Sequence, residues 1–134
     1  MADHSASGAA CGGVRALLRL EGLGLLCGAV ALYGRSGGDW RLFAVLFLTP
    51  DLSFLGYLGG PRAGAAAYNA MHSTLGPLLL AAVGIALAQP LAVSIALIWL
   101  AHVGFDRALG YGLKYGAGFS FTHLGRIGRK PKEN

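Results

Sequence analysis

The stretch "LIWLAHVGFDRALGYGLKYG", residues 97–116, joins a strongly apolar run to a histidine and an aspartate. His102 and Asp106 are four residues apart, which is about one turn of an α-helix, so their side chains share one face. A charged group in hydrocarbon costs at least about 2.5 kcal/mol, and such residues usually face the interior of a helix bundle. The stretch therefore predicts a membrane helix that carries a polar site.

The composition of the whole chain agrees with this interpretation. Of the 134 residues, 54% are hydrophobic and only 13% are charged, whereas about 25% are charged in an ordinary soluble domain. This length supports one domain. The two cysteines, Cys11 and Cys27, have neither metal nor redox spacing, so we expect them to be small packing residues.

Four apolar ranges are each close to the roughly 20 residues that a helix needs to cross a bilayer. They are residues 16–33, 41–58, 63–88 and 91–109. We therefore predict an all-α, integral membrane four-helix bundle, with bends at Pro50 and Pro77. Residues 1–15 are expected to form a disordered leader, because no basic segment precedes an apolar core there. Residues 110–134 form a basic, aromatic, glycine-rich tail.

The basic residues predict the orientation. An even number of spans places both termini on one side, and nine basic residues collect there: Arg15, Arg19, Arg62, Arg107, Lys114, Arg126, Arg129, Lys130 and Lys132. The other side has only Arg35 and Arg41. This asymmetry predicts that both termini lie in the cytoplasm. The expected partners are the bilayer and its anionic lipid at the cytoplasmic face. A homo-oligomer stays open, and no nucleic-acid partner is expected.

Strongly polar side chains occur inside all four predicted helices. They are Glu21, Asp51, Asn69, His72, His102 and Asp106. Counted from the cytoplasmic helix ends at 1.5 Å per residue, they lie at depths of roughly 5–14 Å. Polar groups from four helices at one depth predict a single pocket near the cytoplasmic face.

Two imidazoles with two carboxylates are ligands that suit zinc, manganese or iron. We therefore predict a divalent metal held by Asp51, His72, His102 and Asp106, with Asp106 either binding the ion or orienting the ring of His102. Three alternatives remain open. The groups could form a hydrogen-bonded network that only joins the helices, His72 and His102 could ligate a haem, or the pocket could lie on a proton or ion path.

Four blocks of the sequence also resemble a known family. They are "RLEG" at 19–22, "FLTPDLSFLGYLGGPRAGAAAYNAMH" at 47–72, "WLAHVGFDRALGYGLKY" at 99–115 and "FTHLGRIG" at 121–128. Together they resemble a family of small bacterial four-helix membrane proteins of unknown function, and this resemblance implies a protein of the bacterial inner (cytoplasmic) membrane. A looser resemblance is to the YdjM-like membrane-bound, metal-dependent hydrolases. That resemblance implies metal ligation at Asp51, which follows a proline, at His72, and at the His102–Asp106 pair.

The predicted function is therefore metal-dependent hydrolysis of a lipid or lipid-phosphate, with a metal-bound water as nucleophile. Glu21 is the candidate base, while Asn69 and His123 are expected to support the site. Arg62 and Arg107 are expected to hold an anionic head group. The competing class is a non-enzymatic membrane protein, either a small transporter subunit or a structural partner.

Overall fold

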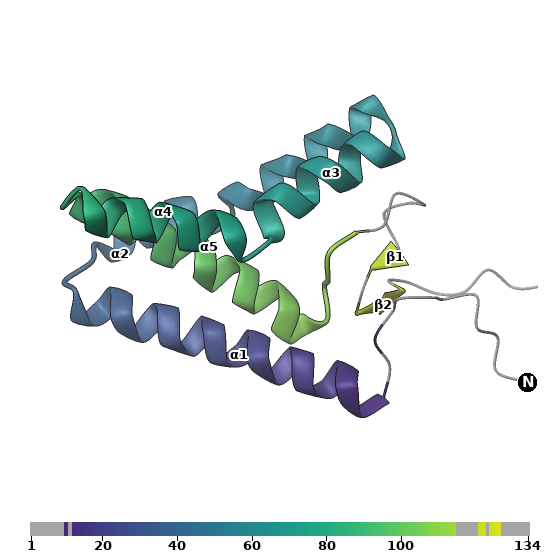
Figure 1. The fold of residues 1–134 in the computed structure, drawn as a ribbon, viewed down its shortest axis with the longest axis horizontal. Helices are drawn as coiled ribbons and strands as arrows, with labels where there is room; N and C mark the ends of the chain where they lie inside the picture. Colours follow the sequence, from purple (N-terminus) through teal and green to yellow (C-terminus); the bar gives the residue numbers. More distant parts are fainter. Residues whose placement is uncertain (1–9, 11, 115–120, 123, 127–134) are drawn as a thin grey trace, which may run out of the picture.

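A computed structural model describes residues 10, 12–114, 121–122 and 124–126, and most of this part is helical. The helices are α1 (Gly12–Arg35), α2 (Trp40–Leu46), the 3-10 helix η1 (Thr49–Gly59), α3 (Pro61–His72), α4 (Leu75–Ala86) and α5 (Pro90–Leu109) (Figure 1). In the tail, the two-residue strands β1 (Phe121–Thr122) and β2 (Gly125–Arg126) pair antiparallel. Apart from this short ladder, the predicted all-helical fold is confirmed for the described residues.

The helices have the length and composition of membrane spans. Three segments are long and apolar enough to cross a bilayer: Gly12–Arg35, Trp40–Gly59 and Pro90–Leu109. The pair α3 and α4 would make a fourth span, but it is bent by 41° at its break. The structure thus has three candidate spans, or four if the bent pair counts as one span, and the predicted number of four stays a prediction. Helix α1 also begins at Gly12, inside the range predicted as a disordered leader.

Both breaks lie just before a proline. Pro50 has no N–H for the carbonyl of Leu46, and the chain changes there from α-helix to 3-10 helix. Pro77 has no N–H for the carbonyl of Ser73, and α3 ends at His72. The bends predicted at these prolines are thus interruptions of the helix.

Polar groups released by the second break find new partners. The backbone N–H of Leu75 donates to Ser73 Oγ at 3.1 Å. The indole N–H of Trp99, on α5, donates to the carbonyl of Met71. Because a backbone group left unpaired in lipid costs several kcal/mol, these bonds would allow the helix to break inside a membrane.

Close glycine contacts set how the helices pack in pairs. Helix α1 lies along α5, and a Cβ on Gly104 would come within 2.6 Å of the backbone nitrogen of Leu26. The 3-10 helix η1 packs on α3, where a Cβ on Gly64 would overlap the ring of Tyr57. In Figure 1, α3 rises away from the line of α1 and α5. The two pairs therefore meet where α3 ends, η1 begins and α5 passes.

The outer surface is strongly apolar. Large side chains that are more than half exposed occur along every long helix: Leu17, Leu20, Leu32, Val45, Leu52, Leu55, Leu58, Leu79, Val83, Ile85 and Leu91. Soluble monomers rarely expose contiguous apolar patches of more than a few hundred Å². This surface and the three long apolar helices suggest a membrane protein.

Candidate metal centre

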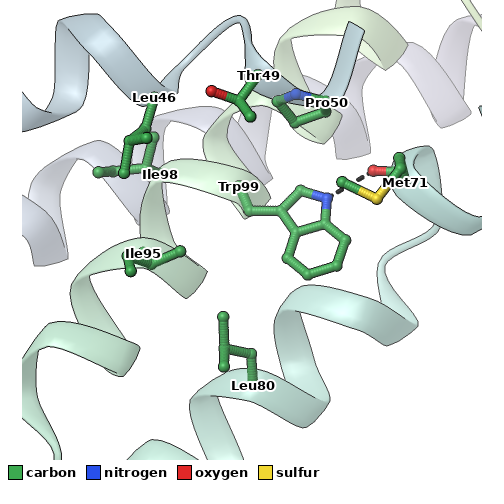
Figure 2. Close-up of a pocket in the computed structure, with 8 residues that line it drawn as sticks. All are labelled: Leu46, Thr49, Pro50, Met71, Leu80, Ile95, Ile98 and Trp99. Carbon is green, nitrogen blue, oxygen red and sulfur yellow. Dashed lines mark hydrogen bonds between the residues drawn. The ribbon is translucent and has the colours of Figure 1, made fainter. Parts of the chain in front are cut away.

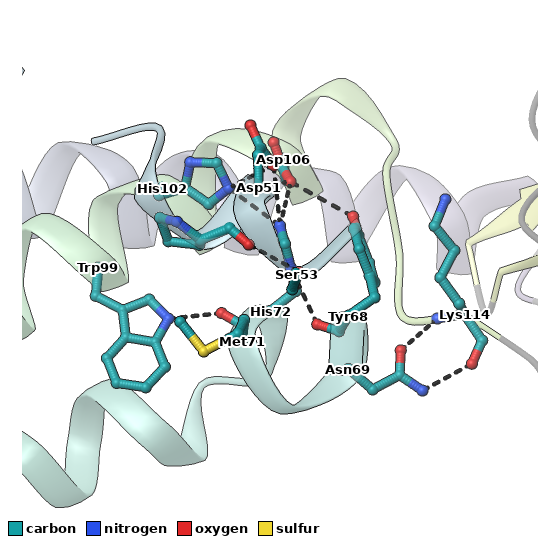
Figure 3. Close-up of polar contacts among 11 residues, drawn as sticks. Asp51, Ser53, Tyr68, Asn69, Met71, His72, Trp99, His102, Asp106 and Lys114 are labelled. Carbon is teal, nitrogen blue, oxygen red and sulfur yellow. Dashed lines mark hydrogen bonds and ion pairs between the residues drawn. The ribbon is translucent and has the colours of Figure 1, made fainter. Parts of the chain in front are cut away.

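Two histidines and two aspartates come together where the helix pairs meet (Figure 3). Asp51 lies in the first turn of η1, and His72 is the last residue of α3. His102 and Asp106 lie on successive turns of α5. One ligand atom from each residue lies within 4.8 Å of the other three. The convergence expected from the sequence is therefore present in the fold.

The separations between these four atoms are short and nearly equal. The Nε2 of His72 lies 3.3 Å from Asp51 Oδ1 and 3.2 Å from Asp106 Oδ2. The Nε2 of His102 lies 3.3 Å from Asp51 Oδ1 and 3.4 Å from Asp106 Oδ2. The two Nε2 atoms are 3.1 Å apart. The remaining pair is Asp51 Oδ1 with Asp106 Oδ2, and these two oxygens lie within 4.8 Å of each other.

These separations match the ligand shell of one metal ion. Around a tetrahedral ion with bonds of 2.0–2.1 Å, neighbouring ligands lie about 3.3–3.4 Å apart. Around a six-coordinate ion with bonds of about 2.2 Å, adjacent ligands lie about 3.1 Å apart and opposite ligands about 4.4 Å apart. Asp51, His72, His102 and Asp106 would therefore hold such an ion with one ligand atom each.

The surroundings of His72 orient its lone pair toward the centre of the group. Its Nδ1 lies 2.9 Å from the carbonyl oxygen of Tyr68, which can only accept, so Nδ1 donates a proton there. In a neutral ring, Nε2 then carries a lone pair instead of a proton. The ring also stacks on that of Tyr68, with centroids 3.7 Å apart and planes 8° apart. A backbone acceptor on the outer nitrogen is typical of a metal-ligating histidine.

Without an ion, the negative charges and lone pairs of the four ligand atoms would be poorly compensated. The two Nε2 atoms lie 3.1 Å apart, and each also lies 3.2–3.4 Å from both carboxylate oxygens. With Nε2 unprotonated in both rings, four lone pairs would converge without a donor between them. A divalent cation would neutralise both carboxylates and accept all four lone pairs, which favours a metal over a network that only joins helices.

His102 is the most enclosed of the four residues, with 1% of its side chain exposed. The edge of its ring meets the ring of Phe47, with centroids 5.4 Å apart. Its Nδ1 is buried and has no partner at hydrogen-bonding geometry among the described residues, although the Phe47 backbone is close enough to interact with it. A metal-bound ring would carry its proton on this nitrogen, facing that backbone.

Asp51 is the most exposed of the four residues. The side chain of Asp51 is 37% exposed, against 14% for Asp106 and 3% for His72. A site closed on all sides would be expected of a structural metal, whereas a catalytic metal keeps a position open. Water or a substrate would therefore approach the centre from the side of Asp51.

Two residues beside the group were not singled out from the sequence. The hydroxyl of Tyr68 donates a long hydrogen bond of 3.5 Å to Asp106 Oδ2. Tyr68 precedes His72 by four residues, and this spacing on one helix face was the signal that could have identified it. Lys114 is buried, and its Nζ lies 4.8 Å from the centre of the Tyr68 ring.

Asn69 holds Lys114 against the helices, as Figure 3 shows. The side-chain amide of Asn69 donates to the Lys114 carbonyl at 2.7 Å, and the Lys114 N–H donates back to Asn69 Oδ1 at 2.6 Å. Burial lowers the pKa of the Lys114 ammonium to about 8, although the negative charge of Asp106 opposes this shift. Asn69 therefore lies next to the group and anchors the start of the tail there.

Glu21, Arg62 and Arg107, which were also predicted for the site, lie outside the group of four. Glu21 is exposed on α1, where its charge interacts with that of Arg107. Arg62 is exposed in the first turn of α3. His123 lies outside the described residues. The structure brings none of the three described residues into the group of four, and their functional roles stay predictions.

The geometry does not suit haem. Two axial histidine nitrogens bind opposite faces of a haem iron and lie about 4 Å apart, at about 2 Å per bond. The Nε2 atoms of His72 and His102 are only 3.1 Å apart, and both also contact two carboxylates. These contacts leave no room for a porphyrin between the rings.

Comparison with known proteins supports the resemblance to a family of unknown function. No curated protein and no solved structure gives a significant match to the chain. A family profile described as "Domain of unknown function (DUF4260)" matches residues 15–127, which include the four candidate ligands. The chain thus belongs to the DUF4260 family of domains of unknown function.

Proposed function

We propose that this protein is an integral membrane enzyme that binds one divalent zinc, manganese or iron ion and hydrolyses a lipid-like substrate. The ligands would be Asp51, His72, His102 and Asp106. The observation that carries the proposal is the set of five separations of 3.1–3.4 Å among their ligand atoms. Those distances suit bonds of 2.0–2.2 Å to a common centre.

The ion would activate a water molecule for attack. A bound divalent metal lowers the pKa of water to about 7, which supplies hydroxide at neutral pH. The exposed side of Asp51 is the route by which a scissile ester or phosphate group would reach the ion. Its second carboxylate oxygen is suited to accept the proton of the attacking water, whereas Glu21 would have to act from outside the group. Arg62 and Arg107 remain candidates for an anionic head group.

Metal content tests the first half of the proposal. We expect about one equivalent of metal per chain in the purified wild type, and near none in His72→Ala and His102→Ala. Glu21→Gln is the matched control, because it removes another ionisable group from the spans without touching the four ligands. Wild type that holds no metal after growth in supplemented medium would overturn the proposal.

Hydrolysis tests the second half. Long-chain nitrophenyl esters and a nitrophenyl phosphodiester would report whether the loaded protein cleaves an ester or a phosphate bond. Cleavage should disappear on chelation and return with added metal. A protein that binds metal stably but cleaves neither substrate class would favour a structural or transport role instead.

The membrane setting is part of the same proposal. The positive charge near the termini supports a bacterial inner-membrane protein with both ends in the cytoplasm and with anionic lipid at that face. A reporter fused to the C-terminus should be active only in the cytoplasm. Activity in the periplasm would reverse the orientation and the side from which the site is reached.

A further inference from the structure

A separate apolar pocket lies among the broken helices (Figure 2). Its volume is about 220 Å³, and residues from α2, η1, α3, α4 and α5 contribute to its wall. The lining residues are Leu46, Thr49, Pro50, Met71, Leu80, Ile95, Ile98 and Trp99. Most of these side chains are aliphatic, and the Trp99 N–H is already bonded to the Met71 carbonyl. The pocket therefore offers shape and carbon surface, with little to bind a charged group.

The pocket wall and the candidate metal centre draw on neighbouring residues of the chain. Pro50 and Met71 immediately precede Asp51 and His72 in the chain. Ile98 precedes His102 by four residues on α5, so both side chains lie on one helix face, about 6 Å apart along the axis. Three of the four candidate ligands thus have a close chain neighbour in the pocket wall.

The size of the pocket suits a short alkyl chain. A cavity of about 150 Å³ lined by apolar side chains binds benzene, which has six carbons. At about 25–30 Å³ per methylene group, close to the share of one water molecule in liquid, a volume of 220 Å³ holds roughly eight carbons. Water in the pocket would find few hydrogen-bond partners, so an apolar occupant is favoured.

We propose that this pocket binds the alkyl chain of the substrate, so that a metal-binding head group at the end of the chain reaches the ion. This inference rests on the proposed function and makes it specific: the substrate is an amphiphile whose first eight or so chain carbons lie in the pocket. The chain enters from the surrounding lipid, so transfer into the pocket gains little from the hydrophobic effect. Selection comes from the shape of the pocket.

Two hydroxamates of different length test the proposal on the full-length protein loaded with Co²⁺. A hydroxamate binds a metal through two oxygens, and the visible spectrum of Co²⁺ reports this change of coordination. Acetohydroxamate has the head group without a chain, and octanohydroxamate adds a chain that would fill the pocket. A steroid-based detergent avoids alkyl chains that would compete for the same space.

Filling the pocket should separate the two probes. Leu80→Trp places an indole in the pocket and should weaken octanohydroxamate at least about tenfold, because overpacking excludes the chain. Acetohydroxamate should bind this variant within about twofold of wild type. Leu79→Trp is the matched control, since Leu79 is 66% exposed on the same helix and lines no part of the pocket. It should leave both affinities unchanged.

The remaining outcomes are each decisive. If Leu80→Trp weakens both probes equally or neither, with its Co²⁺ spectrum intact, the alkyl pocket is wrong and the metal centre stands. If wild type takes up no Co²⁺, the proposed function and this inference fall together. If Leu80→Trp does not fold, Ile95→Phe fills the pocket from α5 and is judged by the same two affinities.

Discussion

Replacing Asp51 by asparagine should separate a metal centre from a hydrogen-bonded network, because the two predict opposite changes in stability. In the absence of an ion, the carboxylate oxygens of Asp51 and Asp106 lie within 4.8 Å of each other. Two unit charges at that distance repel by about 3.5 kcal/mol at an effective dielectric constant of 20. Because Asp51 is 37% exposed, solvent screening should reduce this to about 1–3 kcal/mol.

A bound divalent ion removes that repulsion and adds its own binding free energy to folding. Chelation should therefore lower the unfolding free energy of the wild type. Asp51→Asn keeps the shape of the side chain, removes one of the two negative charges and weakens metal binding. Its metal-free form should be more stable than metal-free wild type, by about 1–3 kcal/mol.

The assay is unfolding in mild detergent, followed by the helical circular dichroism signal, with and without chelator. Wild type should lose stability on chelation, whereas Asp51→Asn should not respond. If the four groups only join the helices, Asp51→Asn weakens the hydrogen bond between His72 Nε2 and Asp51 Oδ1, and the variant should be less stable than wild type in either condition. That result, together with no response of the wild type to chelator, would refute the metal interpretation.

Three further predictions follow from the surroundings of the group. Gly104→Ala should destabilise the protein by about 1–3 kcal/mol, because the new Cβ would lie 2.6 Å from the Leu26 nitrogen. The control Gly28→Ala should not destabilise the protein, because nothing lies within 4 Å of a Cβ there. Equal melting temperatures of the two variants would contradict this packing. The free energy of unfolding should rise between about pH 8 and 10.5, because folding lowers the pKa of Lys114 and the unfolded chain therefore binds more protons in this pH range. Denaturation at pH 7.5 and at pH 10 should show this rise in the wild type and not in Lys114→Met. Tyr68→Phe keeps the ring that stacks on His72 and loses only a hydrogen bond of 3.5 Å to Asp106. Metal affinity, measured by competition with a chelator, should therefore fall less than about tenfold. A complete loss of metal would show that the hydroxyl is essential for metal binding.

The apolar ranges could be located from the sequence because length and hydrophobicity are local properties. A helix that must cross about 30 Å of hydrocarbon needs about 20 apolar residues, whatever its neighbours are. The four ranges therefore correspond to α1, to α2 with η1, to α3 with α4, and to α5. The prolines indicated where two of them bend, but not that the backbone would break there and be repaired by Trp99 and Ser73.

The candidate ligands were also predictable, since an ionisable side chain in an apolar helix is costly and must find partners. The rotation of each helix was not. A Cβ on Gly22 would lie 2.6 Å from that of Arg107, so α1 turns its glycine toward α5. Glu21, one residue earlier, is rotated by about 100° from that contact, and it is exposed outside the group of four.

The sequence by itself thus determined the apolar spans, the positions of their prolines and the set of ionisable residues they carry, because each follows from the cost of placing a residue in lipid. Only the tertiary structure decided which polar residues meet, that Tyr68 and Lys114 lie beside them, and that an apolar pocket lies next to His102. Those features depend on how the helices rotate and approach one another, and in lipid that is set by the fit of small residues and the pairing of buried polar groups.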